Sequence, residues 1–463
     1  MKFNATIIIA FDVVLTIFSL FSAAIIRLGY DEVSQNLLNS ATIYMTLIFV
    51  VIVMFSSHLM EVYDPGKNVN NRNIIVNVVS GVVTSFALLS VVYYLYPDVL
   101  LGRGVLAMSL SFFALLQFCS HSLYLLGKNH SRFSQRILVL GTGALAESIG
   151  GMISSSSQNF VLAGYASCYG ALRENDAEFA LTVVPQNKIL GNFDNLLETA
   201  QKALADIIVV ALSERRGVFP LKDVLMCKLH GIQVMDAPSL YELIQGKLML
   251  ESITPGWFIF AGGFRKATIF SICKRFVDVV LSSTGLLITM PFFPIIALMI
   301  KLDSAGPVFF RQERVGYQEK RFMLFKFRTM GQDAEKGTGA VWASKNDPRV
   351  TKLGRFFRGS RIDEIPQMIN VLRGDMSFVG PRPERPEFVE NLKLVIPFYS
   401  KRHFIKPGVT GWAQVRYPYG SSVEDAFEKL RYDLYYIKNS GPFLDTLIFF
   451  ETIKVVLFGF GGR

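Results

Sequence analysis

Four long apolar segments near the N-terminus constrain the fold of this chain more than any other feature. The sequence places them approximately at residues 5–28, 41–60, 74–96 and 105–126. Each is close to the roughly twenty residues with which a helix crosses a bilayer. The first is long and lacks a small-residue cleavage site, so we expect it to remain as an anchor. The sequence therefore predicts a membrane protein with a four-helix transmembrane domain over residues 1–130.

Basic residues are distributed unevenly around these segments. One side of the predicted bundle carries Lys2, Lys67, Arg72, Lys128, Arg132 and Arg136, and the other side carries Arg27 and Arg103. Because basic loops tend to stay in the cytoplasm, this pattern predicts that both ends of the bundle are cytoplasmic. We interpret His58, Cys119 and His121 as packing or interface residues that have no acidic partner in the helices.

The composition indicates more than one unit. The chain has 463 residues, of which 51% are apolar, and a mean hydropathy of +0.37, which is too high for a single soluble domain. The net charge is +10, and residues 301–463 carry 27 lysines and arginines against 18 aspartates and glutamates. This basic excess predicts contact with anionic substrates or lipid head groups. No nucleic-acid recognition module accompanies it, so we expect no nucleic-acid partner.

The four cysteines are far apart and form no CxxC pair. They are Cys119, Cys168, Cys227 and Cys273. Widely spaced cysteines without histidine-rich neighbours are typical of a reducing compartment, so we expect buried free thiols and neither disulfides nor zinc ligands.

Residues 134–250 show short β-branched runs that alternate with helical patterns. This alternation predicts a Rossmann-like α/β domain. The first strand leads into a glycine turn with Gly141 and Gly143, a candidate nucleotide turn because it follows a strand and opens a helix. The second strand ends at Ser167 and Cys168, where a dinucleotide site would carry an acidic residue for the ribose. We therefore expect a regulatory or structural domain, with nucleotide binding as the less favoured alternative.

A connector over residues 251–267 leads to a long apolar run at residues 276–300. Pro291 and Pro294 interrupt this run, and a proline inside a helix costs about 3 kcal/mol. By length the run could span the membrane as a kinked helix. Basic residues lie at both of its ends and give it no sidedness, so we favour a re-entrant membrane helix over residues 269–302 that breaks at the prolines.

Two adjacent carboxylates, Asp363 and Glu364, come just before an apolar helical run. The arginines around them are Arg355, Arg358, Arg361, Arg373 and Arg382. Pro366 is tolerated only in the first turn of a helix, which predicts that the carboxylates lie at or beside a helix N-terminus. An isolated acidic pair would be a helix cap. Carboxylates among arginines are instead typical of phosphate chemistry, in which a nucleophile is held in line and cations neutralise the oxygens.

Several runs in the C-terminal unit resemble the core of the bacterial sugar transferases, the monotopic polyprenyl-phosphate phosphoglycosyl transferases. The resemblance covers about residues 268–463 and rests on the runs KLDSAGPVFFRQERVGY, FKFRTM, NDPR and HFIKPGVTGWAQV and on the stretch around Asp363. It implies an α/β monotopic catalytic domain that includes the re-entrant helix. The larger members of this family carry a Rossmann-like domain before it.

The resemblance also implies an activity. A hexose-1-phosphate would pass from a UDP-sugar to undecaprenyl phosphate with release of UMP, as the first membrane step of exopolysaccharide or O-antigen synthesis. Asp363 would form a covalent aspartyl-phosphosugar and bind Mg²⁺, and Glu364 would act as a metal partner or base. The residues expected to bind substrate are Lys326, Arg328, Arg358, Arg382, His403 and Arg416. Some members have Asn-Gly-Arg after the AQV run, where this chain has Arg416.

The expected partners are therefore a UDP-sugar donor, undecaprenyl phosphate and the bacterial inner membrane, with the catalytic domain on its cytoplasmic face. A second copy of the chain is a candidate partner.

The main alternative is a membrane-anchored nucleotide-sensing scaffold that binds anionic lipid. It would explain the basic charge and the glycine turn but not Asp363 and Glu364. A nucleotide-sugar epimerase or dehydratase is disfavoured because residues 136–250 contain no Tyr-x-x-x-Lys pair.

Overall fold

The chain divides into two compact units, Met1–Ile244 and Gln245–Arg463. The computed structural model describes residues 2–36, 39–60, 62–63, 71–127, 134–156, 160–167, 182–192, 195–212, 219–253, 255–264, 268–331, 334, 347–417, 420 and 422–458. Cys168 and three of the basic residues used in the topology prediction, Lys67, Lys128 and Arg132, lie outside these residues.

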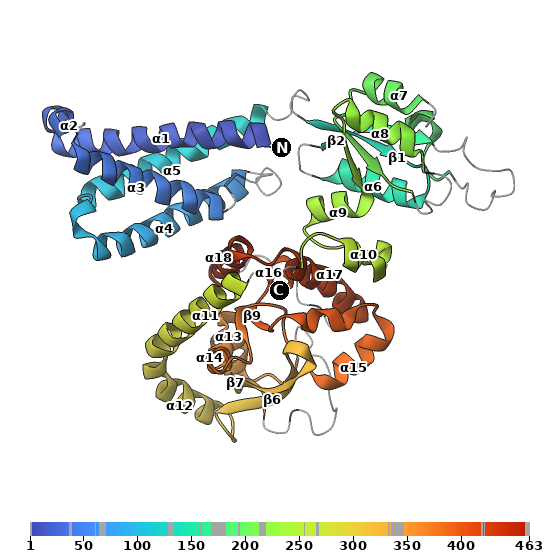
Figure 1. The fold of residues 1–463 in the computed structure, drawn as a ribbon. Helices are drawn as coiled ribbons and strands as arrows, with labels where there is room; N and C mark the ends of the chain where they lie inside the picture. Colours follow the sequence, from blue (N-terminus) through green and yellow to red (C-terminus); the bar gives the residue numbers. More distant parts are fainter. Residues whose placement is uncertain are drawn as a thin grey trace. The chain divides into compact units, whose positions relative to one another are not determined.

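The first unit begins with long apolar helices (Figure 1). They are α1 (Lys2–Leu28), α2 (Tyr30–Asn36), α3 (Ser40–Leu59), α4 (Asn71–Leu95), the 3₁₀ turn η1 (Pro97–Val99) and α5 (Arg103–Gly127). By length and composition, α1, α3, α4 and α5 each contain a stretch that could cross a membrane. Leu20, Phe49, Leu89 and Phe113 meet in a shared core. The prediction of a membrane protein is confirmed by these helices.

Polar side chains lie inside this apolar core and form the Asp12 cluster, which consists of Asp12, Ser57, Gln117 and His121. Asp12 on α1 is fully buried, and its Oδ2 accepts a hydrogen bond of 2.6 Å from Gln117 Nε2. The same oxygen lies 3.1 Å from His121 Nε2 on α5. Gln117 Nε2 also donates to Ser57 Oγ on α3 at 3.3 Å. The interpretation of His121 as a residue without an acidic partner was therefore wrong.

A parallel sheet forms the α/β part of the first unit. Its strands are β1 (Gln135–Leu140), β2 (Phe160–Ser167), β3 (Ile189–Asn192), β4 (Ile207–Val210) and β5 (Gln233–Asp236), in the spatial order β3-β2-β1-β4-β5. The helices are α6 (Ala144–Ser155), α7 (Leu196–Lys202), α8 (Leu221–Leu229) and α9 (Ala237–Gln245), with a 3₁₀ turn η5 (Gln186–Lys188).

Helices cover both faces of this sheet because successive side chains of a strand point to opposite sides. Ile137 and Val139 of β1 pack with residues of α6 and α9. Leu138 and Leu140 pack with residues of α7 and α8 on the other face. The predicted α/β sheet domain is therefore present.

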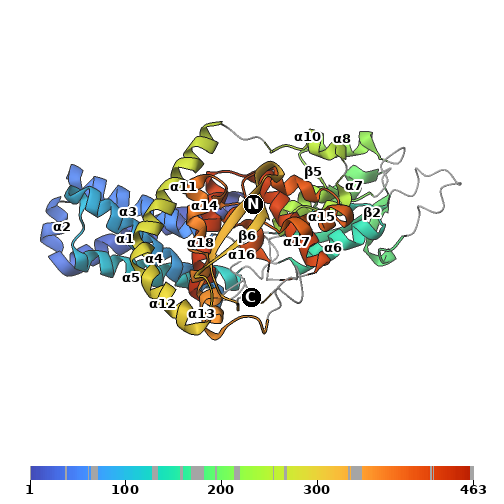
Figure 2. The ribbon, with the colours of Figure 1, turned by 90° about the horizontal axis from the view of Figure 1, so that it is seen from below.

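The second unit contains short strands surrounded by helices. Its elements are η7 (Leu250–Ser252), α10 (Pro255–Phe260), α11 (Thr268–Thr289), η8 (Met290–Phe292), α12 (Phe293–Asp303), β6 (Phe309–Val315), η9 (Tyr317–Glu319), β7 (Arg321–Phe327), α13 (Lys352–Ser360), η10 (Ile362–Glu364), α14 (Gln367–Arg373), β8 (Ser377–Val379), α15 (Pro386–Val395), η11 (Tyr399–Phe404), β9 (Gly408–Thr410), α16 (Trp412–Arg416), α17 (Val423–Asn439) and α18 (Pro442–Phe458). Strands β6 and β7 pair antiparallel, and β8 and β9 pair parallel. Helices α11 and α12 lie on one flank of the unit, and α15 and α17 lie on the other (Figure 1 and Figure 2).

The core of the second unit begins earlier in the sequence than the predicted domain border at residue 250. Leu248 and Leu250 are buried together with Trp412 and with apolar residues of α17 and α18. Trp412 Nε1 also donates a 2.7 Å hydrogen bond to Gly246 O. The chain therefore passes from one unit to the other between Ile244 and Gln245, at the C-terminal end of α9.

The apolar segment α11–η8–α12 is attached to the second unit at both of its ends. Near its start, Lys274 Nζ donates to Val379 O at 3.0 Å, and Asp278 Oδ1 accepts from Phe378 N at 2.8 Å. At its end, Ile300 packs with Phe327 in a small core. Pro291 lies in η8 and Pro294 in the first turn of α12, so the break falls at the predicted prolines. Many apolar side chains between these two ends are exposed.

The described cysteines are free thiols, as predicted, but they are not all buried. Cys227 lies in the core of the α/β sheet domain. Cys119 on α5 and Cys273 on α11 are exposed, and both lie on helices that could contact lipid. The prediction of burial is therefore correct for Cys227 alone among these three.

Candidate active site

Asp363 and Glu364 lie in η10, a single 3₁₀ turn between α13 and α14. Arg361 ends α13 in a left-handed conformation, with φ 60 and ψ 15, and this reverses the chain into η10. Pro366 is the N-cap of α14, so the carboxylates precede a helix as the sequence predicts. The turn buries both groups, since Asp363 is 6% exposed and Glu364 is 7% exposed.

Three cationic side chains surround Glu364. Lys326 Nζ and Arg382 Nη2 both donate to Oε1, at 2.9 and 2.7 Å. Arg361 Nη1 donates to Oε2 at 3.3 Å. Lys326 can reach Glu364 because side chains alternate along β7, and its neighbour Phe327 is buried in the core on the other face. The described structure thus brings together residues of β7, η10 and the loop after β8.

The pKa values of Asp363, Glu364 and Lys326 depend on one another's charges. Burial alone would raise the pKa of Glu364, but Arg382, Lys326 and Arg361 together hold it well below its usual value. Burial raises the pKa of Asp363, and the nearby Glu364 charge adds to this, although Lys326 opposes it. Burial also lowers the pKa of Lys326, against the attraction of Glu364. Glu364 is therefore a fixed anion and a poor base, while Asp363 is the carboxylate whose charge is costly.

Asp363 has a free oxygen that points to a reactive role. Its Oδ2 lies 4.0 Å from Lys326 Nζ, and its Oδ1 is buried without a hydrogen-bond partner among the described residues. A buried carboxylate oxygen of this kind is suited to attack an electrophile or to bind a hard cation. Within the described part of the chain, no group of three or more His, Cys, Asp or Glu side chains could hold a metal. Mg²⁺ would fit here with phosphate oxygens and water as its other ligands, which is how it commonly binds.

Two further predicted substrate-binding arginines have different surroundings: Arg358 acts on the charge of Asp363, and Arg328 is hydrogen-bonded to Ser304. Arg358 Nε donates to Thr329 Oγ1 at 3.0 Å, and the charge of Arg358 helps to lower the pKa of Asp363 against the dominant effect of burial. Arg328 Nη2 donates to Ser304 O at 2.7 Å. Its Nε and Nη1 are buried and have no partner in the described structure. Arg328 therefore retains donors that a phosphate could use.

The other two predicted substrate-binding residues have different surroundings. His403 is 6% exposed, and its Nδ1 lies 3.8 Å from Glu319. Burial and the neighbouring Arg402 lower the pKa of His403 to about 4, so its ring is neutral at pH 7. Arg416 stacks on the ring of Trp412 at 4.2 Å. Neither of them takes part in the described ion pairs of the two carboxylates.

The sequence analysis named Arg361 only as one of the arginines around the carboxylates, without a role, and it did not name Gln367. Arg361 pairs with Glu364 at the i, i+3 spacing, which was the signal that could have identified it. Gln367 is 2% exposed, and its Nε2 has no partner among the described residues. No local pattern in the sequence distinguishes this glutamine from any other polar residue at the start of a helix.

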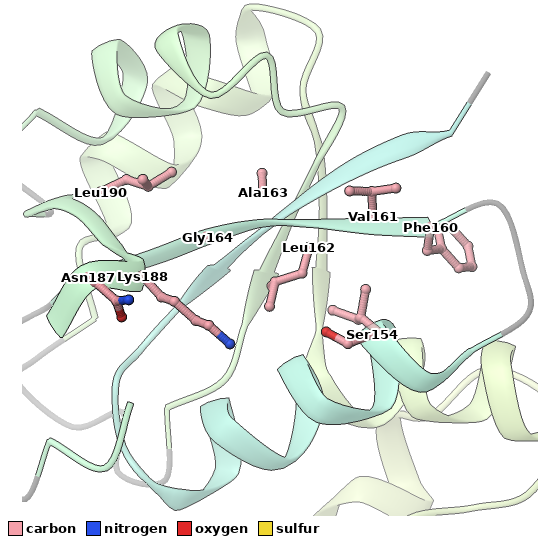
Figure 3. A pocket seen from close by; sticks show the side chains of 10 residues that line it. Ser154, Phe160, Val161, Leu162, Ala163, Gly164, Asn187, Lys188 and Leu190 are labelled. Carbon is pink, nitrogen blue, oxygen red and sulfur yellow. The ribbon is translucent and has the colours of Figure 1, made fainter. Parts of the chain in front are cut away.

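The candidate nucleotide turn of the α/β sheet domain shows no comparable chemistry. Gly141 has φ +127, and a Cβ there would lie 2.6 Å from Ala211 O, so the turn itself requires this glycine. Gly143 is the N-cap of α6, and a Cβ there would meet nothing within 4 Å. A cavity of about 430 Å³ lies elsewhere, between α6 and the β2–β3 edge, with Lys188 as its charged residue (Figure 3). The turn is explained by the fold without a ligand.

Comparison with known proteins agrees with the geometry of the second unit. The family described as bacterial sugar transferase matches residues 269–459. The exopolysaccharide production protein PSS of Rhizobium leguminosarum bv. phaseoli is 40% identical over 187 residues, which are 39% of this chain and 94% of that protein. The chain belongs to the bacterial sugar transferase family. The matched range contains both carboxylates and the three cations that pair with Glu364 in the described structure.

Two relatives that match over a longer stretch of the chain carry more specific names. The UDP-N-acetylgalactosamine-undecaprenyl-phosphate N-acetylgalactosaminephosphotransferase of Aeromonas hydrophila is 40% identical over 237 residues, 51% of this chain and 55% of that protein. The undecaprenyl-phosphate glucose phosphotransferase of Komagataeibacter xylinus is 33% identical over 344 residues, 71% of this chain and 60% of that protein. The chain thus spans somewhat more than half the length of each of these relatives.

Proposed function

We propose that this sugar transferase moves a hexose-1-phosphate from a UDP-sugar to undecaprenyl phosphate and releases UMP. The observation that carries the proposal is the free, buried Oδ1 of Asp363 beside a carboxylate that three cations keep ionised. The name of the A. hydrophila relative contains both a UDP-sugar and undecaprenyl phosphate, which supports the proposal. The reaction would be the first membrane step of exopolysaccharide or O-antigen synthesis on the cytoplasmic face of the inner membrane.

The proposed reaction has two transfers at one phosphorus atom. An oxygen of Asp363 forms a bond to the phosphorus that carries the sugar, and the bond from that phosphorus to the bridging oxygen breaks. The electron pair of the broken bond stays on that oxygen, which leaves as part of UMP. A phosphate oxygen of undecaprenyl phosphate then attacks the same phosphorus, and Asp363 departs as a carboxylate. The covalent aspartyl-phosphosugar divides one difficult step into two easier ones.

The cations around the carboxylates have a positioning role in this reaction. Lys326, Arg361 and Arg382 are fixed by Glu364, so Glu364 acts as a counter-ion and not as a base. Their positive charges can stabilise the negative charge that develops on the phosphate oxygens. The unpartnered Nε and Nη1 of Arg328 are suited to the same task.

Mg²⁺ is the cofactor that we propose for this site. The free oxygen of Asp363 would hold it, and the ion would neutralise charge on the diphosphate and the departing UMP. Glu364 is less suited to bind the ion because both of its oxygens already accept hydrogen bonds.

We place the segment α11–η8–α12 in the membrane as a re-entrant helix pair. Support comes from its two ends, which contact the same compact unit, and from the exposed apolar side chains between them. From Asp278 to the break at Pro291 the helix has about thirteen residues, which reach about 20 Å. This is less than the roughly 30 Å of the hydrocarbon core. The active site would then lie at the level of the lipid phosphate.

Cysteine labelling tests this membrane topology. Gly262 and Ala305 flank the segment, both are exposed, and a Cβ at Gly262 meets nothing within 4 Å. Gly262→Cys and Ala305→Cys, in a chain without native cysteines, should both react with an impermeant maleimide only after the cytoplasmic face is opened. Labelling of Ala305→Cys in intact cells would show that the segment spans the membrane.

A UMP-release screen tests the proposed function. The purified full chain in nanodiscs with Mg²⁺ and undecaprenyl phosphate is given UDP-glucose, UDP-galactose or UDP-N-acetylgalactosamine. Release of UMP with at least one donor, dependent on the lipid for multiple turnovers, is the expected result. Failure with all UDP-sugars, together with binding to anionic vesicles, would favour the alternative of a membrane-anchored scaffold.

A further inference from the structure

The loop that carries Arg382 is held through its carbonyl groups. This Arg382 loop comprises residues 380–385, which connect β8 to α15. The donor and acceptor pairs are Gly408 N to Pro381 O (2.9 Å), Arg402 Nη2 to Arg382 O (3.0 Å), Arg314 Nη1 to Pro383 O (3.1 Å) and Val315 N to Glu384 O (2.9 Å). Four consecutive carbonyls are thus bound by donors from other parts of the second unit.

The sequence of the loop explains why carbonyl groups are used. Pro381 and Pro383 flank Arg382, and proline has no N–H group to donate. The loop is too irregular to form a ladder of its own, so donors from elsewhere must fix it. Two of the four donors are backbone amides of β9 and β6, and the other two are arginine side chains.

Arg402 differs from the other donors because it belongs to a buried ion pair. Its Nη1 donates to Tyr399 Oη at 2.6 Å, and its Nη2 donates to Asp433 Oδ2 at 2.7 Å as well as to Arg382 O. Arg402 is 6% exposed and Asp433 is 2% exposed. A planar guanidinium with donors in fixed directions can satisfy three acceptors at once, which a lysine ammonium on a flexible stem does less well.

Stability alone is a weak reason for such a buried ion pair. Removing two charges from water costs several kcal/mol, and well-packed apolar residues often replace a buried pair without loss of stability. The pair between Arg402 and Asp433 gives something that apolar residues could not, namely a hydrogen-bond donor aimed at Arg382 O. On the other side of the same residue, Arg382 Nη2 donates to Glu364 Oε1 at 2.7 Å.

We propose that Arg402, fixed by Asp433 and Tyr399, is a positioning residue that sets the place of Arg382 in the active site. It does so through the Arg382 carbonyl and touches neither Glu364 nor Asp363 itself. Its effect on turnover rests on the proposed function, whereas its effect on the loop does not. A displacement of about 1 Å in a group that contacts the reacting atoms can cost about 100-fold in rate, so a rigid loop matters here.

Hydrogen–deuterium exchange tests the effect on the loop without any substrate. Arg402→Lys in the full chain should make the amides of Arg382, Glu384 and Arg385 exchange about tenfold faster, as expected for the loss of a charge-assisted hydrogen bond. The matched control is Arg431→Lys. Arg431 lies on α17 and pairs with Glu251 and Glu428, and Arg431→Lys should leave the amides of the Arg382 loop unchanged. Unchanged exchange in Arg402→Lys would overturn the proposal.

A double-mutant cycle tests the effect on the reaction. Arg402→Lys should lower the rate of UMP release about tenfold in the wild-type background. In an Arg382→Met background, the same substitution should change the rate by less than about twofold, because the group that it positions is already gone. Equal factors in both backgrounds, or a drop in solubility and melting temperature that accounts for the lost activity, would mean a structural role only.

The exchange experiment and the double-mutant cycle together distinguish a failure of this proposal from a failure of the proposed function. If wild-type chain releases no UMP from any UDP-sugar, the proposed function fails and the exchange experiment alone decides on Arg402. If UMP is released but the cycle is additive and the loop amides are unaffected, the proposed function stands and the positioning role is wrong.

Discussion

The two units each bury an aspartate, and the two sites differ in how its charge is compensated. In the Asp12 cluster, one oxygen of Asp12 accepts from Gln117 and lies beside His121, and these partners come from one facing helix, α5. In the candidate active site, Asp363 has Lys326 at 4.0 Å as its described ion-pair partner, while the closer contacts of the cations go to Glu364.

The difference shows how a buried carboxylate can serve structure in one place and chemistry in another. Gln117 and His121 use short contacts to Asp12, and such contacts hold helices together where no water is available. Asp363 is the less satisfied member of its pair, and Glu364 takes the strong hydrogen bonds. Asp12 also has one buried oxygen, Oδ1, without a hydrogen-bond partner among the described residues, so the feature that sets Asp363 apart is the second carboxylate, which keeps three cations in place beside it.

The largest effect is expected for the substitution that removes only the reactivity of Asp363. Asp363→Asn should lower UMP release by more than about 1,000-fold, because an amide keeps the shape but is no nucleophile. Labelled sugar phosphate that is trapped on the wild-type protein should be absent from the variant. The melting temperature serves as the control and should fall little. An adduct of undiminished yield in Asp363→Asn would place the nucleophile elsewhere.

The pH dependence of adduct formation gives the next largest effect. Because burial raises the pKa of Asp363, its ionised form is lost at a higher pH than for an ordinary aspartate at 3.8. Single-turnover adduct formation should therefore fall about tenfold per pH unit below that raised pKa. Lys326 opposes the shift, so Lys326→Met should move the inflection to still higher pH. An inflection that moves to lower pH in Lys326→Met would contradict the assignment of these charges.

The smallest effect is expected in the Asp12 cluster. Asp12→Ala leaves Gln117 and His121 without their shared acceptor, which should cost roughly 1–3 kcal/mol of stability. The measurement is the melting temperature in nanodiscs, with UMP release per folded molecule unchanged. Ser111→Ala is the matched control, since Ser111 is exposed on α5 and bonds only within its own helix. Lost turnover without lost stability would show that the two buried aspartates do not divide their roles in this way.

Features that depend on neighbouring residues could be predicted well from the sequence. The apolar segments, the strand at β1 with its glycine turn and the break at Pro291 all follow from periodicity or backbone geometry over a few positions. The pair Asp363 and Glu364 was visible for the same reason. The left-handed conformation of Arg361 could not be predicted, because no local sequence pattern indicates a positive φ at a residue other than glycine.

By itself, then, the sequence determined the apolar character of the N-terminal helices, the α/β alternation and the adjacent carboxylates with their excess of arginine. Only the tertiary structure decided which cations meet Glu364, since Lys326 and Arg382 are 38 and 18 positions away from it. The same holds for His121 and Asp12, which are 109 positions apart, and for Arg402 and Asp433, which are 31 positions apart. The physical reason is that a charge has many potential partners along a chain. Burial selects among them, because an unpaired charge in the interior costs far more than one in water.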